Sequence, residues 1–187
     1  MTPVPYITKW STEVPDSSRL VRSRRGGIAY ADETASDRDT HGTLWVRMSS
    51  SPGEGRPDFG IVHTPRQRRA MQDLLCQVCG GPADTSDDGV LWLLEDHRDD
   101  WSGWPDGMGV TEPPVCLTCV DVSTSACPAL RRSYAVIRAK TYPVAGVLGI
   151  KPSGPGGPDL VPFGDPRLPW VLALELVRQL GQCTILN

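Results

Sequence analysis

The chain has 187 residues, a formal net charge of −3 and a hydrophobic fraction of 39%. Its length fits one domain, and its composition excludes an intrinsically disordered chain. No run approaches the ~18 apolar residues of a membrane span, and the N-terminal sequence has no basic and apolar signal segment. We therefore expect a cytoplasmic protein, away from membranes, whose cysteines stay reduced and free to bind metal.

The first 63 residues predict a β-rich part with many loops. The chain holds 19 glycines and 18 prolines, which favour short, interrupted elements. Side chains that favour strands, such as Tyr30 and Trp45, gather between these breakers. The expected strands lie at residues 4–10, 27–31, 43–48 and 59–63.

The rest of the chain predicts alternating helices and strands. Thr64 suits an N-cap and Pro65 the first helical position, so we expect a helix from there to about Leu75. The apolar run at 90–94 predicts a buried strand. Further expected elements are a helix at about 116–122, a longer helix at 128–140, a strand at 144–150, a linker at 151–157, a helix at 168–180 and a strand at 183–186.

Two Cys-x-x-Cys pairs, Cys76 with Cys79 and Cys116 with Cys119, predict a structural zinc site. Two intervening residues let both sulfurs of a pair turn toward one metal ion, and four thiolates complete the tetrahedral coordination of Zn²⁺. The 36 residues between the pairs exceed the usual spacing of about 15–20, but the entropic cost of closing a loop grows only logarithmically. Two alternatives remain open, a redox Cys-x-x-Cys motif and simple burial of reduced cysteines.

The order of these elements carries a family resemblance. A cysteine knuckle, a strand region and a second pair at a helix start resemble a treble-clef zinc module over about residues 75–125. The stretches 74–82, 89–94 and 113–119 look like a group of uncharacterised actinobacterial zinc-binding proteins, with similarity over about 60–187. This resemblance implies a bacterial, cytosolic origin and a shared zinc core, and it implies no activity.

These observations predict the fold class. We expect an α+β fold in which a small antiparallel sheet and several helices surround a treble-clef-like four-cysteine zinc site. The single domain would span residues 1–187, with a β-rich part (1–63), a zinc module with helices (64–140) and a C-terminal strand and helix (141–187).

The dipeptide Asp96-His97 lies between the two cysteine pairs, an order that resembles the zinc modules of HNH-type nucleases. The chain departs from that pattern, because Val120 stands where a histidine would follow Cys119 and no asparagine lies between the pairs. His97 could act as a general base, but no neighbour in the sequence would hold a catalytic Mg²⁺. We interpret the resemblance as degenerate.

Charge is unevenly distributed, with one basic and ten acidic residues in 76–127 and a net positive charge on either side. An acidic centre with Trp92, Trp101 and Trp104, in a chain without a recognisable catalytic constellation, favours a protein-interaction adaptor or regulator. One alternative is a nucleic-acid-binding regulator, and another is an enzyme of unknown reaction in a bacterial biosynthetic pathway, with Cys127 or Cys183 as a thiol of open role. The nucleic-acid reading rests on the arginines at 19–25, 66–69 and 131–138.

Overall fold

The computed structural model describes residues 3–152 and 156–187, so residues 153–155 of the predicted linker lie outside the described residues. The strands are β1 (Thr8–Trp10), β2 (Leu20–Arg22), β3 (Ile28–Tyr30), β4 (Leu44–Trp45), β5 (Pro57–Val62), β6 (Thr85–Ser86), β7 (Gly89–Leu94), β8 (Gly109–Val110), β9 (Ala135–Thr141), β10 (Val144–Ile150), β11 (Asp159–Pro162), β12 (Leu172–Gln179) and β13 (Gly181–Ile185). The helices are α1 (Thr64–Asp73) and α2 (Leu117–Ala126), with short 3-10 helices η1 (Ala35–Asp37) and η2 (Leu168–Trp170).

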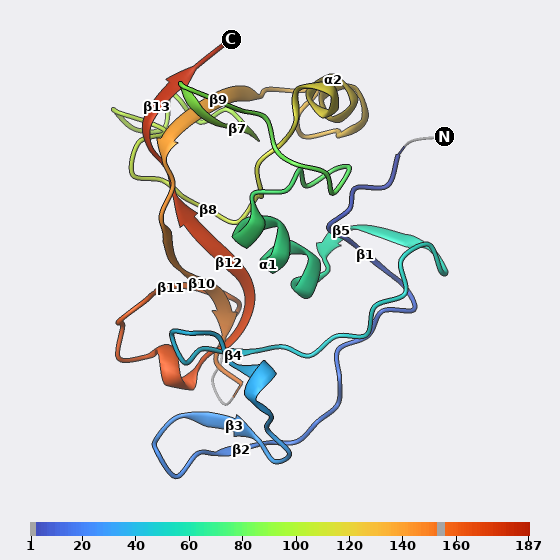
Figure 1. Ribbon diagram of the computed structural model, residues 1–187, viewed down its shortest axis with the longest axis vertical. Coiled ribbons are helices and arrows are strands. Elements are labelled where there is room, and N and C mark those ends of the chain that lie inside the picture. Colours follow the sequence, from blue (N-terminus) through green and yellow to red (C-terminus); the bar gives the residue numbers. More distant parts are fainter. Residues whose placement is uncertain (1–2, 153–155) are drawn as a thin grey trace.

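Two larger sheets form the body of the molecule (Figure 1). In one, the strand order is β11-β10-β12-β4, and β8 also pairs with β12. The other has the order β13-β9-β7-β6. Neighbours pair antiparallel except β12 with β4, which are parallel. Two small ribbons, β1-β5 and β2-β3, complete the described part of the chain.

The predicted fold class is wrong. The described residues hold only two α-helices, and strands dominate, so the molecule is not a small sheet surrounded by several helices. All seven expected strand segments contain a strand, namely β1, β3, β4, β5, β7, β10 and β13, although β1 and β4 are shorter than expected. The error therefore lies in two segments expected to be helical.

The first of these segments is 128–140, which contains turns and then β9 instead of a long helix. Ala135, Ile137 and Ala139 are buried, whereas the residues between and after them are partly or fully exposed. This period of two is the pattern of a strand with one covered face. Pro128 suggested a helix start, but the pairing of β9 with β7 and β13 outweighs that local signal.

The second segment is 168–180, predicted as an amphipathic helix within the C-terminal part. It forms η2 and then β12, the central strand of its sheet. β12 pairs with β10 along one edge and with β4 and β8 along the other, and side chains on both of its faces are buried. A strand covered on both faces shows a nearly continuous apolar run, which periodicity cannot distinguish from a buried helix.

Helix α1 packs against β12 and fixes the position of the chain before the first cysteine pair (Figure 1). The fully buried Gln67 donates to the carbonyl oxygens of Thr111 (2.6 Å) and Leu176 (2.9 Å) and accepts from the Leu176 amide (2.9 Å). The helix is confirmed over Thr64–Asp73, but its N-cap is His63 and not Thr64, because the His63 ring accepts from the Arg66 amide. Gln67 thus joins the helix to the centre of the sheet.

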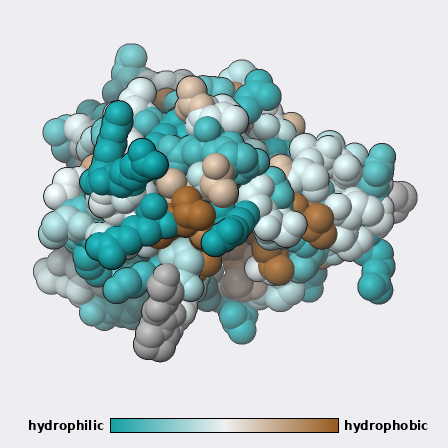
Figure 2. Space-filling view, turned by 90° about the horizontal axis from the view of Figure 1, so that it is seen from below, coloured by the Kyte–Doolittle hydropathy of each residue, from teal (hydrophilic) through white to brown (hydrophobic). Residues whose placement is uncertain are grey.

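Hydrophobic residues of both larger sheets, of α1 and of the loops form the main core, which includes Trp92, Trp104 and Leu176. Figure 2 shows the molecule from below, which is the end where β2 and β3 lie in Figure 1. On this face, hydrophobic side chains form patches among hydrophilic ones. None of the helices in the described ranges is long and apolar enough to cross a membrane.

Candidate metal centre

The first cysteine pair lies in a tight turn that follows α1. The Cys76 amide donates to the Gly81 carbonyl oxygen (2.7 Å), and the Gly80 amide donates to the Cys76 carbonyl oxygen (2.9 Å). Gly80 has φ +72°, and a Cβ there would lie 2.9 Å from the ring of Tyr6. Only glycine meets both conditions without strain, so the sequence after Cys79 is matched to this turn.

The second pair lies at the N-terminus of α2, as the sequence predicts. Cys116 is the N-cap residue, with extended backbone angles, and the Cys119 amide donates to the Cys116 carbonyl oxygen (3.0 Å). The first turn of this helix has no acidic residue. The positive end of the helix dipole therefore favours negative charge on these two sulfurs.

The fold brings all four sulfurs together. The sulfur atoms of Cys76, Cys79, Cys116 and Cys119 lie within 4.8 Å of one another, and the Cys79 and Cys116 sulfurs are 3.9 Å apart. Zn–S bonds of about 2.3 Å in a tetrahedron place sulfurs about 3.8 Å apart. The four cysteines could therefore hold a metal ion.

The electrostatics of this cluster also favour a cation. Burial, together with the neighbouring thiols of Cys116 and Cys76, raises the pKa of Cys119 well above its usual range. Four thiols so close together ionise only if a positive charge is bound among them.

The two remaining cysteines lie apart from the cluster. Cys127 is half-buried at the C-cap of α2. Burial, with the nearby carboxylate of Asp106, raises the pKa of the Cys183 thiol to about 12. This direction is the opposite of the lowered pKa that activates a cysteine nucleophile.

Asp96 and His97 lie in the loop after β7 and interact within that loop. Asp96 pairs with Arg98 (2.8 Å), and His97 Nδ1 lies 2.8 Å from a carboxylate oxygen of Asp100. The partner of Asp96 (Arg98) and the partner of His97 (Asp100) both belong to the same loop. These contacts therefore order the loop and involve no residue of the four-cysteine cluster.

Two of the three tryptophans of the acidic centre are inside the protein, and for Trp92 this agrees with the buried strand predicted at 90–94. Trp92 is fully buried and Trp104 is 6% exposed, whereas Trp101 is 43% exposed. The indole Nε1 of Trp92 donates to the Glu112 carbonyl oxygen (3.2 Å). Only Trp101 of the three offers its ring to a partner, so this part of the adaptor argument is corrected.

Sequence analysis missed a buried ion pair that holds the N-terminal part. Arg66, one of the arginines on which the nucleic-acid alternative rests, forms two hydrogen bonds of 2.6 Å with Glu13 and a third with the Thr8 carbonyl oxygen (2.8 Å). Burial alone would raise the pKa of Glu13, but the bonds from Arg66 and from backbone amides outweigh it and lower the pKa to about 2. No local pattern links residues 53 positions apart.

A groove of about 330 Å³ lies beside the first cysteine pair. Its walls come from β5, from Gln77 and Val78 of the turn, and from Cys127 and Leu130 after α2. Phe59 and Ile61, on its rim, are 62% and 49% exposed. The groove is thus the place where apolar side chains of the N-terminal part and of the cysteine-bearing part meet.

The position of Phe59 and Ile61 follows from an irregular strand pairing. Val62 pairs with Thr8, but the next pair joins Asp58 to Lys9, so residues 59–61 have no partner in β1. The Tyr6 amide donates to the Val78 carbonyl oxygen (2.9 Å), which fixes the chain before β1 on the cysteine turn.

Comparisons of the chain with models of known families, with curated proteins and with solved structures found no match.

Proposed function

We propose that this chain is a protein-interaction adaptor whose docking groove is braced by one structural zinc ion. Cys76, Cys79, Cys116 and Cys119 would supply four thiolates to the metal and leave no open position for a substrate, so the ion serves stability and not catalysis. The order of turn, β6-β7 hairpin and helix around them supports a treble-clef-like module.

The observation that carries this proposal is the groove with Phe59 and Ile61 exposed at its rim. Large apolar side chains that stay in solvent are common anchors of protein contacts when they lie beside a concave surface. Val78 and Cys127 in the opposite wall belong to the zinc-binding part. Loss of the metal would therefore displace one wall of the groove.

Charge at the groove indicates the kind of partner. Glu95 and Glu112 both line it and are exposed, and Glu112 has no ion pair within the described residues. Only Arg132, at 3.8 Å, pairs with Glu95, and both side chains are solvent-accessible, so this pair contributes little. The favoured partner is a peptide segment with an apolar anchor followed by lysine or arginine.

The alternative of nucleic-acid binding has less support, because several of the arginines on which it rests are engaged within the chain. Arg66 is buried against Glu13, and Arg138 pairs with Asp84. Arg131 donates to the carbonyl oxygen of Ser125 (2.8 Å). A phosphate backbone needs cations that are free at the surface.

Selection of peptides from a random phage library, followed by fluorescence polarisation, tests the adaptor proposal. We expect selected peptides to share an apolar residue and a basic one. The double variant Phe59→Ala/Ile61→Ala should bind them at least about tenfold more weakly, the cost of losing one apolar anchor. Leu186→Ala removes a similarly exposed apolar side chain that does not line the groove, and its affinity should equal that of the wild type.

Either of two results would contradict the proposal: the library yields no binder, or the binders do not distinguish the double variant from the wild type. The metal is tested separately, by mass spectrometry of the purified protein. We expect about one zinc ion per chain, as four cysteine ligands require. If the purified chain is folded but contains no metal, zinc does not brace the groove. The docking role of the groove would then depend on the peptide-binding result alone.

A further inference from the structure

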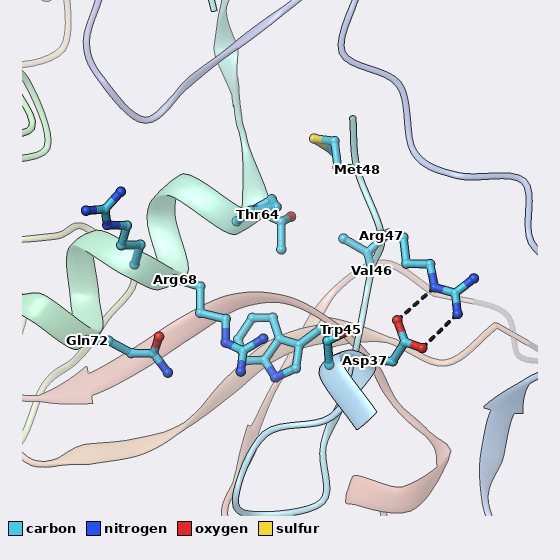
Figure 3. A pocket seen from close by; sticks show the side chains of 11 residues that line it. Asp37, Trp45, Val46, Arg47, Met48, Thr64, Arg68 and Gln72 are labelled. Atoms are coloured by element: carbon cyan, nitrogen blue, oxygen red, sulfur yellow. Dashed lines mark hydrogen bonds and ion pairs between the residues drawn. The ribbon is translucent and has the colours of Figure 1, made fainter. Parts of the chain in front are cut away.

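A second concave site lies between α1 and the chain around β4 (Figure 3). Its volume is about 410 Å³, within the range of small-molecule sites. Val46 and Met48 form an apolar wall, while Arg68, Arg69 and Gln72 of α1 form a polar one. The site shares no lining residue with the docking groove.

Arg68 is the unusual side chain of this site. Its guanidinium stacks on the ring of Trp45, 4.5 Å from the ring centroid. Its Nε is buried and has no hydrogen-bond partner, and no carboxylate of the described residues lies within ion-pair distance. Burial lowers the pKa of Arg68, and the charge of Asp39 offsets only part of this effect. A half-buried cation is thus left without a counter-ion.

Among the described residues, the guanidinium groups of the other shielded arginines have partners for their charge, although the Nε of Arg66, like that of Arg68, has no hydrogen bond. Arg66 binds Glu13 through two hydrogen bonds of 2.6 Å, and Arg47 binds Asp37 through two of 2.7 Å. Arg178 donates to backbone carbonyl oxygens, including that of Met71 (2.8 Å). Burying a charge without a partner is costly, so the exception at Arg68 calls for a partner from outside the chain.

The carboxylates around this site do not supply that partner. Asp37 is occupied by Arg47. Asp39 accepts from the Trp45 indole Nε1 (3.0 Å) and from the backbone amides of His41 (2.9 Å) and Thr43 (3.0 Å). The first turn of α1 contains no acidic residue, so the positive end of its dipole adds to the charge of Arg68 and Arg69.

We propose that this site binds the oxyanion of a small organic molecule, a phosphate monoester or a carboxylate, through the guanidinium of Arg68. The planar guanidinium, held against Trp45, offers parallel donors that match two oxygens of such a group. Gln72 can donate a further hydrogen bond from its amide. The apolar part of the ligand packs on Val46 and Met48. This site is independent of the docking groove and of the metal.

Nuclear magnetic resonance tests the proposal on the full, metal-loaded chain. The indole N–H signal of Trp45, assigned with Trp45→Phe, reports on the ring beneath Arg68. Phenyl phosphate and benzoate are titrated separately, with sodium chloride at equal ionic strength as the reference. We expect a saturable shift with one or both probes and none with chloride. A response to phenyl phosphate identifies a phosphate ligand, and a response to benzoate a carboxylate.

Variants decide whether Arg68 carries the binding. Arg68→Gln should weaken it at least about tenfold, since hydrogen bonds to charged groups are among the strong ones. Arg69→Gln changes the neighbouring, more exposed arginine, which pairs with Asp73 at 3.5 Å, and should weaken binding less than about threefold.

Arg68→Lys keeps the charge but loses the planar guanidinium. This variant replaces Arg68→Gln in the test if Arg68→Gln does not fold. It should bind at least about threefold more weakly than the wild type. Binding that is unchanged in the folded Arg68 variant, or a wild-type response that does not saturate or that chloride reproduces, would overturn the proposal.

Discussion

The four-cysteine cluster and the Glu13–Arg66 ion pair each join segments that lie far apart in the sequence. Cys79 and Cys116 are 37 positions apart, and Glu13 and Arg66 are 53 apart. In the ion pair, the chain supplies both the negative charge, from Glu13, and the positive charge, from Arg66. The cluster contains only potential anions, so its four sulfurs would attract one another only through a cation from solution.

This difference determines how each region should fail. With a metal bound as proposed, loss of one thiolate would lower the affinity of the other three for it. Loss of Glu13 leaves the buried guanidinium of Arg66, 8% exposed, without a counter-charge. The first failure depends on the supply of metal, whereas the second depends on pH.

The largest expected effect is that of Cys76→Ser. Metal binding contributes of order 10 kcal/mol to folding in small zinc modules, so this variant should lose its metal and the fixed structure of residues 76–127. Thermal unfolding and metal analysis, measured together, check this result. A Cys76→Ser protein that melts like the wild type would show that the cluster is not the brace we describe.

Cys127→Ser is the matched control. Cys127 is half-buried and does not belong to the cluster. Its substitution should change the free energy of unfolding by less than about 1 kcal/mol and leave the metal content unchanged. A loss of metal in this variant would bring Cys127 into the site.

Glu13→Gln should have the next largest effect. Breaking a buried ion pair by removal of one partner costs about 3–5 kcal/mol, because the remaining charge is unpaired. Urea unfolding measures this loss, and metal analysis should find the zinc content unchanged, which separates the two regions. The double variant Glu13→Gln/Arg66→Met removes both charges and should recover part of the loss. If the double variant were the less stable, unpaired charge would not be the cause.

The two regions also differ in how far the sequence predicts them. The cysteine cluster was foreseeable, because each pair has the spacing that a metal requires and Cys116 lies at a helix start. Strands such as β7 and β10 were foreseeable from apolar runs between breakers. These signals are local, and each is complete within about ten residues.

What escaped prediction depends on distant partners. β12 is a strand because β10, β4 and β8 border it, and its own apolar run does not distinguish that outcome from a helix. Arg66 was counted among the arginines available to nucleic acid, because no local pattern in the sequence links it to Glu13. The adaptor, by contrast, stays a prediction, supported by the four cysteines that the fold brings together and by the groove beside them.

The contribution of the Glu13–Arg66 ion pair to the free energy of unfolding should depend on pH. This smaller effect further distinguishes the ion pair from the four-cysteine cluster. The pKa of Glu13 falls from an ordinary 4.5 to about 2 on folding, so between these values the unfolded chain binds more protons and stability rises with pH. The contribution is complete above about 4.5 and is lost as the pH falls to about 2. The stability difference between the wild type and Glu13→Gln should therefore shrink in acid below about pH 4.5. A difference that stays constant down to about pH 3 would contradict the assignment to Glu13.

The smallest effect on stability is expected where the two regions meet, at the docking groove. Phe59 and Ile61 are largely exposed, so Phe59→Ala/Ile61→Ala should change the free energy of unfolding by no more than about 0.5 kcal/mol per site while it weakens peptide binding. Glu13→Gln makes the converse test, since Arg66 also holds the Thr8 carbonyl of β1, and Thr8 lines the groove. We expect it to weaken peptide binding although Glu13 itself does not line the groove. If Phe59→Ala/Ile61→Ala instead cost as much stability as Glu13→Gln, these side chains would belong to the core of the fold, and the argument that they await a partner would fail.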